Sequence, residues 1–209
     1  MTKEITQPQR RRRKEARPTE ILDAATSVFA EKGYAGTNLN EVAKRAGVSK
    51  GTLYRYFDTK EDIFRAVAQA AFTANLEGME KSASGFNGSV SLLIPMLLKT
   101  AAGGLGDSHI PAIVRMVIAE SRQFPDLARI WHDNVVVRML NLLTTILAEG
   151  QMKGEIRQGD PHLQALSIVG PMITAVLFRE VFCSDSGFRP ELLPLAESHS
   201  DIVLRGLMA

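Results

Sequence analysis

The chain has 209 residues, of which 45% are hydrophobic, 23% are charged and 6% are aromatic. This composition is ordinary for a soluble globular protein, and the length suits one or two domains. A single cysteine, Cys183, excludes an intrachain disulfide and fits a reducing cytoplasm. No apolar run follows the basic start, so no signal peptide is expected, and the longest uncharged stretch, residues 163–178, is too short to span a membrane.

The formal net charge of +2 hides an asymmetry along the chain. Residues 1–65 contain 14 Lys and Arg against 9 Asp and Glu, whereas residues 66–209 contain 11 against 14. The first part therefore suits a polyanion. Residues 10–14 are all basic and either form a solvated tail or lie along DNA phosphates or in a minor groove. We expect residues 1–17 to be a flexible basic arm.

Residues 37–60 predict two short helices joined by a tight turn. Thr37 or Asn38 can cap the first helix with a side-chain oxygen. Gly47 permits the left-handed backbone that ends this helix, and Ser49 is placed to cap the second. The apolar residues of the first helix have the spacing of one buried face: Leu39, Val42, Ala43 and Ala46.

The second of these helices, residues 50–57, has an unusual outer surface. Leu53 and Phe57 lie four residues apart and are expected to face inward. The remaining side chains suit DNA, because Lys and Arg reach phosphates or guanine edges, Tyr hydroxyls bind phosphates and Thr can contact a thymine methyl. A glycine at the helix start allows close approach to the duplex. These residues are Lys50, Gly51, Thr52, Tyr54, Arg55 and Tyr56. The spacing alone also fits an ordinary amphipathic helix pair.

About 45 residues of this region resemble the DNA-binding domain of the tetracycline-repressor (TetR) family. The matched segments are Ile21-Leu22-Asp23-Ala24-Ala25, Phe29-Ala30-Glu31-Lys32-Gly33-Tyr34, Gly36-Thr37, Val42-Ala43-Lys44-Arg45-Ala46-Gly47-Val48-Ser49, Lys50-Gly51-Thr52-Leu53-Tyr54-Arg55-Tyr56-Phe57 and Thr59-Lys60-Glu61. The resemblance implies that residues 50–57 enter a major groove. It also implies direct DNA contacts by Lys50, Thr52, Tyr54, Arg55 and Tyr56, and phosphate contacts by Thr37, Ser49 and Lys60.

The rest of the sequence predicts an all-α protein of about nine helices. Residues 18–65 should form the helix-turn-helix domain, starting with a helix over 18–32 that ends at Gly33. A fourth helix should run from Thr59, with a capping box to Asp62, to about residue 81 and couple the two domains. The remaining helices are predicted near residues 89–102, 110–123, 125–152, 161–183 and 190–208.

Residues 114–131 are similar to the C-terminal domains of AcrR- and AefR-like members of the same family. The similarity lies in Ile118-Ala119-Glu120 and Phe124-Pro125-Asp126-Leu127. It implies that residues 66–209 form a ligand-binding and dimerisation domain. The helices near 161–183 and 190–208 are the candidates for the homodimer interface, although an apolar helix can also be central in a monomer core.

Eight residues are candidates for contacting the ligand. Met is flexible and suits a broad apolar pocket, although it is also an ordinary core residue. Aromatic and polar side chains nearby could stack on a ligand or bind it. The candidates are Met96, Arg115, Met116, Trp131, His132, Met139, Met172 and Phe178.

Two alternatives to a DNA-binding regulator are an enzyme and a protein-interaction module. The chain lacks a nucleophile elbow, a phosphate loop and a dinucleotide fingerprint. Its four histidines have no spacing suited to a metal, so no cofactor is expected. Glu120 and Asp126 could form a carboxylate pair, although acids at helix ends are more often caps or ion-pair partners.

We therefore predict a cytoplasmic, homodimeric transcriptional regulator that is not an enzyme and has no membrane association. A repressor is favoured, released from a palindromic operator by a small apolar or aromatic effector. A two-fold dimer would place its recognition helices about 34–36 Å apart, or a multiple of that distance. Activation stays open, because the sign of regulation depends on where the operator lies relative to the promoter.

Overall fold

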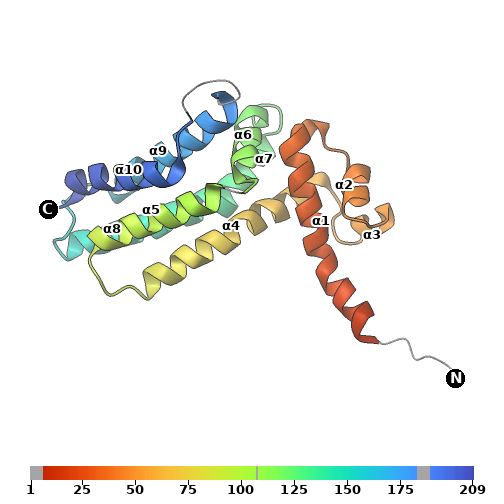
Figure 1. The fold of residues 1–209 in the computed structure, drawn as a ribbon, viewed down its shortest axis with the longest axis horizontal. Coiled ribbons are helices and arrows are strands. Elements are labelled where there is room, and N and C mark those ends of the chain that lie inside the picture. Colours follow the sequence, from red (N-terminus) through yellow and green to blue (C-terminus); the bar gives the residue numbers. More distant parts are fainter. Residues whose placement is uncertain (1–6, 107, 183–188) are drawn as a thin grey trace.

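The computed structural model describes residues 7–106, 108–182 and 189–209, and these are helical with no strand among them (Figure 1). Helices α1 to α3 form a small head beside the start of α4, and α5 to α10 form a larger body with the rest of α4. The predicted all-α class is thus confirmed. Side chains of residues 7–16 and 71–75, and all of Cys183, lie outside the described part.

The described helices correspond to the nine predicted ones. The predicted helix over 125–152 is divided into three consecutive segments, α7, η1 and α8, and the other predicted helices each match one helix. Their bounds are α1 Gln7–Gly36, α2 Leu39–Arg45, α3 Lys50–Tyr54, α4 Lys60–Ser84, α5 Val90–Gly106, α6 Ile110–Glu120, α7 Pro125–Trp131, the π-helical segment η1 His132–Val136, α8 Val137–Met152, α9 Pro161–Phe182 and α10 Leu192–Leu207.

The expected start of the first helix at Pro18 is wrong. Helix α1 begins at Gln7, so residues 7–17 of the predicted basic arm are helical. Arg, Lys and Gln are good helix formers and favour this extension, although Pro18 removes the hydrogen bond to the carbonyl of residue 14 and its ring crowds that carbonyl. Gly33 interrupts this helix as predicted, with φ of 72°, but a further helical turn continues to Gly36.

Local capping fixes the helices that follow. Asn38 caps α2, Ser49 caps α3, and Thr59 with Asp62 forms the predicted capping box at the start of α4. Helix α3 ends at Tyr54, three residues earlier than predicted.

A cluster of aromatic rings forms the core of the head. The ring of Phe29 lies 5.8 Å from those of both Tyr34 and Phe64, and the rings of Tyr34 and Phe64 are 5.9 Å apart. All three side chains are almost fully buried. Leu53 of α3 and Val42 of α2 are buried in the same cluster, so the two short helices are held by α1 and α4 rather than by their own length.

Helix α9 is a long apolar helix of the body. Its 22 residues have a window with mean hydropathy of 1.6, so by length and composition alone it could span a membrane. In the structure it packs against α6, α8 and α10, and its inner face is buried. Packing in the body therefore accounts for part of its apolar character, and its outer face remains exposed.

The capping box at the start of α4 gives a prediction about stability. Thr59→Ala removes the hydroxyl that accepts the N–H of Asp62 and is expected to lower the free energy of unfolding by about 1 kcal/mol. Urea unfolding followed by circular dichroism measures the change. Thr145→Ala, at an exposed position within α8, is the matched control, and an equal loss there would contradict the capping role.

Candidate nucleic-acid interface and ligand cavity

Helix α3 is anchored by Leu53, which is fully buried, and capped by Ser49. The Ser49 Oγ accepts the N–H of Thr52 at 3.1 Å and lies 2.9 Å from the Thr52 hydroxyl. Because the buried side is fixed in this way, Lys50, Gly51 and Arg55 are left exposed on the outer side.

Two cation–π contacts orient the basic side chains of this surface. The Lys50 ammonium lies 5.7 Å from the ring centroid of Tyr54, which is 40% exposed. The Arg55 guanidinium lies 5.5 Å from the ring of Tyr56. Tyr56 differs from the prediction, because it is half-buried against the head core.

A shallow hollow of about 480 Å³ adjoins this surface. Lys50, Tyr54 and Lys60 contribute two ammonium groups and a phenol to its wall. These groups suit an anion such as a phosphate. The remaining wall residues come from the end of α1 and the start of α2: Ala35, Gly36, Thr37, Asn38, Leu39 and Asn40.

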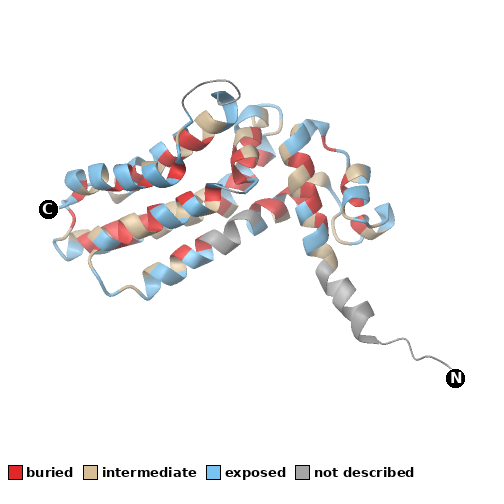
Figure 2. Ribbon diagram, viewed as in Figure 1, coloured by how far each residue is buried: buried red, intermediate tan, exposed pale blue. Residues whose placement is uncertain are grey.

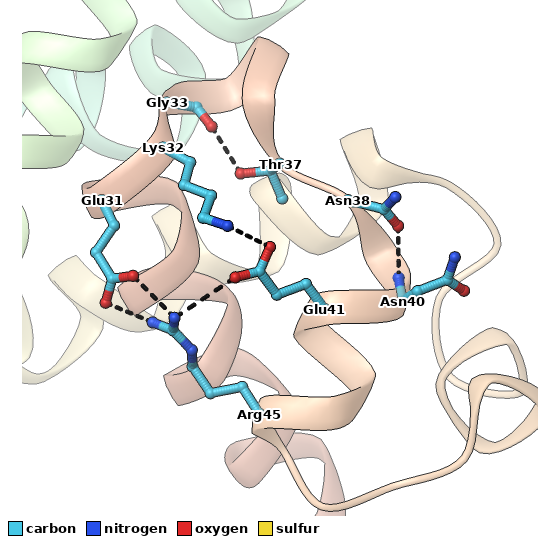
Figure 3. Close-up of polar contacts among 8 residues, drawn as sticks. All are labelled: Glu31, Lys32, Gly33, Thr37, Asn38, Asn40, Glu41 and Arg45. Carbon is cyan, nitrogen blue, oxygen red and sulfur yellow. Dashed lines mark hydrogen bonds and ion pairs between the residues drawn. The ribbon is translucent and has the colours of Figure 1, made fainter.

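The structure gives two of the predicted phosphate contacts roles inside the protein. The Thr37 side chain is buried, and its hydroxyl donates to the Gly33 carbonyl at 2.6 Å (Figure 3). The Thr37 hydroxyl is therefore not presented to a phosphate. The Lys60 ammonium donates to the carbonyls of Tyr34 at 2.8 Å and Thr37 at 3.2 Å, so any phosphate contact would use its remaining N–H.

An exposed ion-pair network joins α1 to α2 (Figure 3). Arg45 donates to Glu31 at 2.8 Å, and Lys32 donates to Glu41 at 2.7 Å. The hydrogen bond from Arg45 lowers the pKa of Glu31. These charges thus pair with one another across α1 and α2.

The body contains an apolar cavity of about 570 Å³. Helices α4 to α9 and η1 contribute to its wall. Among the described residues, no charged side chain lines it, and Thr174 is the one with a hydroxyl. Of the predicted ligand contacts, Trp131, Met139 and Met172 line the cavity.

The other five predicted ligand residues lie outside the cavity wall. Met116 and Met96 pack in the core elsewhere. Arg115 lies 3.8 Å from Glu180, and the exposed His132 lies beside Asp133. The ring of Phe178 contacts that of Phe182. The prediction instead missed aliphatic wall residues such as Val114, Val117, Val135 and Val136.

The π-helical segment η1 connects the cavity wall to α4. The Asn134 amide donates to the Ile130 carbonyl at 2.7 Å and accepts from Gln69 of α4 at 2.8 Å. Val135 of the same segment lines the cavity. π-Bulges of this kind are common at functional sites.

Glu120, at the end of α6, binds the head. Its carboxylate oxygens accept the backbone N–H groups of Tyr34 at 2.8 Å and Ala35 at 2.7 Å. Asp126 pairs instead with Arg129. Glu120 and Asp126, the candidate carboxylate pair, thus bind separate partners rather than each other.

The outer faces of α9 and α10 carry exposed apolar side chains, and Figure 2 shows exposed residues along much of α10. These side chains are Leu163, Leu166, Val181 and Phe182 on α9 and Leu193 and Ile202 on α10. The described residues contain no cluster of three or more His, Cys, Asp or Glu that could hold a metal.

Both halves of the chain match known protein families. Residues 21–67 match the family described as bacterial regulatory proteins, tetR family, and residues 97–197 match the AefR-like transcriptional repressor C-terminal domain. The chain is 32% identical over 160 residues to the fatty acid metabolism regulator protein of Bacillus subtilis, covering 75% of this chain and 81% of the relative.

Solved structures show the same similarity over the whole fold. FadR from Bacillus subtilis in complex with stearoyl-CoA has a TM-score of 0.76 and 26% identity, covering 90% of this chain and 98% of that one. FadR from Bacillus halodurans has a TM-score of 0.78 and 24% identity, covering 97% and 98%. The chain therefore belongs to the TetR family of bacterial transcriptional regulators.

Proposed function

We propose that this DNA-binding repressor is a cytoplasmic homodimer that recognises a palindromic operator through α3 and is released by a ligand with a long apolar chain. The observation that carries the DNA-binding part is the division of α3 into a buried anchor, Leu53, and an exposed side with Lys50, Tyr54 and Arg55. A surface of this composition suits a major groove.

The DNA contacts can be divided by chemistry. We assign Arg55 and Thr52 to base edges, whereas Lys50 and Tyr54 border the hollow and suit phosphates. Ser49 keeps its hydroxyl on Thr52 and so acts mainly as the cap of α3. Tyr56 holds the Arg55 guanidinium by a cation–π contact and is not expected to contact DNA itself.

The cavity and a structural relative together indicate the class of effector. A volume of about 570 Å³ falls within the roughly 300–1,000 Å³ of small-molecule pockets. Burying a charge in an apolar wall costs free energy, so a charged head group must lie outside the cavity. The similar FadR structure from Bacillus subtilis contains stearoyl-CoA. We infer that the cavity takes an acyl chain while its head group stays in solvent.

The dimer is proposed to form through α9 and α10. The exposed apolar residues of α9 include Leu163 and Leu166, three residues apart on one face, and Ile202 of α10 is 65% exposed. Contact with a second copy would remove this apolar surface from water. We infer that the chain acts by binding, and the partners of the two candidate carboxylates support this, since Glu120 accepts two backbone amides and Asp126 pairs with Arg129.

The DNA-binding proposal is tested with a duplex that the protein selects from a random pool. Arg55→Ala is expected to lose about 1–3 kcal/mol on the selected duplex and less on random duplex, if Arg55 contacts a guanine. Fluorescence anisotropy at two salt concentrations measures both affinities. Lys153→Ala, an exposed basic residue directly after α8, is the control. Equal losses on both duplexes would make Arg55 a phosphate contact, and failure of the wild type to select any sequence would overturn the proposal.

The dimer proposal predicts that Leu163→Glu with Ile202→Glu produces a folded monomer. A charge in the centre of an apolar interface is costly to bury. Sedimentation measures the molecular mass, and circular dichroism checks that helicity is retained. Leu92→Glu, equally exposed but on α5, is the control. A dimer that persists in the double variant would place the interface elsewhere.

The effector proposal predicts that stearoyl-CoA lowers affinity for the selected duplex and changes the fluorescence of Trp131. Trp131 is the single tryptophan and lines the cavity, so its emission reports occupancy. Val169→Phe, which narrows the cavity, should weaken stearoyl-CoA binding about tenfold or more, since a misfit in a packed wall costs roughly 1–3 kcal/mol. Met152→Phe, at an exposed position, is the control. CoA alone should have no effect, and an equal response to CoA would contradict binding of the chain.

A further inference from the structure

The end of α6 is one of the main contacts between body and head, because it packs against α1. Both carboxylate oxygens of Glu120 accept a backbone N–H group of the head, from Tyr34 and from Ala35. The ring of Phe124, which follows α6, also lies 5.0 Å from that of Tyr34. In Figure 1, α6 and α7 lie at the junction between the body and α1.

The backbone of the head is shaped to receive this carboxylate. Gly33 has φ of 72°, which favours glycine and turns the next amides away from the α1 axis. A Cβ at Gly33 would lie 2.3 Å from the Glu120 Oε1, closer than atoms can approach. A side chain at Gly33 would therefore push the Glu120 carboxylate out of its present position.

The same helix forms part of the ligand cavity. Ile110, Val114, Val117 and Ile118 of α6 line the wall. Glu120 follows Val117 by three residues, a rise of about 4.5 Å along the axis. Because a short helix moves as a unit, a ligand that displaces the α6 wall also displaces the carboxylate.

The path continues from Tyr34 to the DNA-facing side. The N–H of Tyr34 donates to Glu120, and its carbonyl accepts from the Lys60 ammonium, which also lies 4.5 Å from the Tyr34 ring. Lys60 borders the hollow beside Lys50 and Tyr54. A consecutive series of contacts thus joins the cavity wall to the proposed phosphate site.

We propose that Glu120 is the positioning residue that couples ligand occupancy to the orientation of the head. The proposal rests on the ligand response proposed above. It assigns the coupling between the two domains to α6, whereas the sequence analysis predicted that the long helix α4 couples them. An occupant that moves α6 withdraws the carboxylate from the two amides and lets the head turn away from its operator-binding orientation. By linkage, operator binding opposes this movement and weakens ligand affinity by the same factor.

The first test measures coupling with stearoyl-CoA as the probe. In the wild type we expect the ligand to weaken affinity for the selected duplex by about 5–150-fold, the usual range of allosteric coupling. In Glu120→Ala the ratio should fall toward one, while Trp131 fluorescence still reports ligand binding of wild-type strength. Glu77→Ala removes an exposed carboxylate from α4 and should keep the full ratio. An unchanged ratio in Glu120→Ala would overturn the proposal.

The second test requires no ligand. Val114→Phe places a larger side chain at the cavity wall of α6 and should weaken operator binding at least fivefold in the wild-type background. In the Glu120→Ala background the same substitution should have almost no effect, because the connection is already broken. Equal effects in both backgrounds would contradict coupling through Glu120. Glu120→Gln, which keeps one carbonyl acceptor, is expected to give an intermediate result.

Amide exchange provides a measurement that needs neither DNA nor stearoyl-CoA. The amides of Tyr34 and Ala35 should exchange slowly in the wild type and at least tenfold faster in both Val114→Phe and Glu120→Ala. Suppose that stearoyl-CoA does not change the operator affinity of the wild type in the first test, while Val114→Phe accelerates this amide exchange. The proposed effector class is then wrong, and the coupling through Glu120 stands. Slow exchange in Val114→Phe would overturn the coupling, whatever the effector.

Discussion

Burial of Tyr34 between head and body is the constraint on which the arrangement of the two domains depends. Its ring contacts those of Phe29 and Phe64 in the head and Phe124 of the body. Burial first, and the nearby Glu61 carboxylate second, raise the pKa of the Tyr34 phenol, so the ring stays neutral. The backbone of the same residue binds Glu120 and Lys60. A single residue therefore fixes α1, α4 and α6 relative to one another.

Features set by local sequence could be predicted, because a few neighbouring residues determine them. Ser49 and Thr59 cap their helices as the spacing indicates, and Leu53 is buried as its position requires. The start of α1 was not predicted, because Pro18 is typical of a helix start, although a long helix can also accommodate a proline at a cost of about 3 kcal/mol.

Features that join distant segments could not be predicted from spacing. Met139 lines the cavity whereas Met116 is core, and the sequence offers no signal to distinguish them because both are apolar positions on helices. Glu120 accepts from residues 85 and 86 positions earlier in the chain. Its role depends on the bend at Gly33, and glycine followed by tyrosine at a helix end gives no indication of a partner.

Helix α9 places the cavity and the proposed dimer face on one element. Leu166, Gly170 and Thr174 line the cavity, yet they are exposed in the single chain. In a dimer built on α9, a second copy would cover these residues and close the cavity on that side. This accounts for the absence of charge over residues 163–178, since both faces of the helix must then be covered by apolar groups. Ligand occupancy would consequently act on α6 and on the dimer face together.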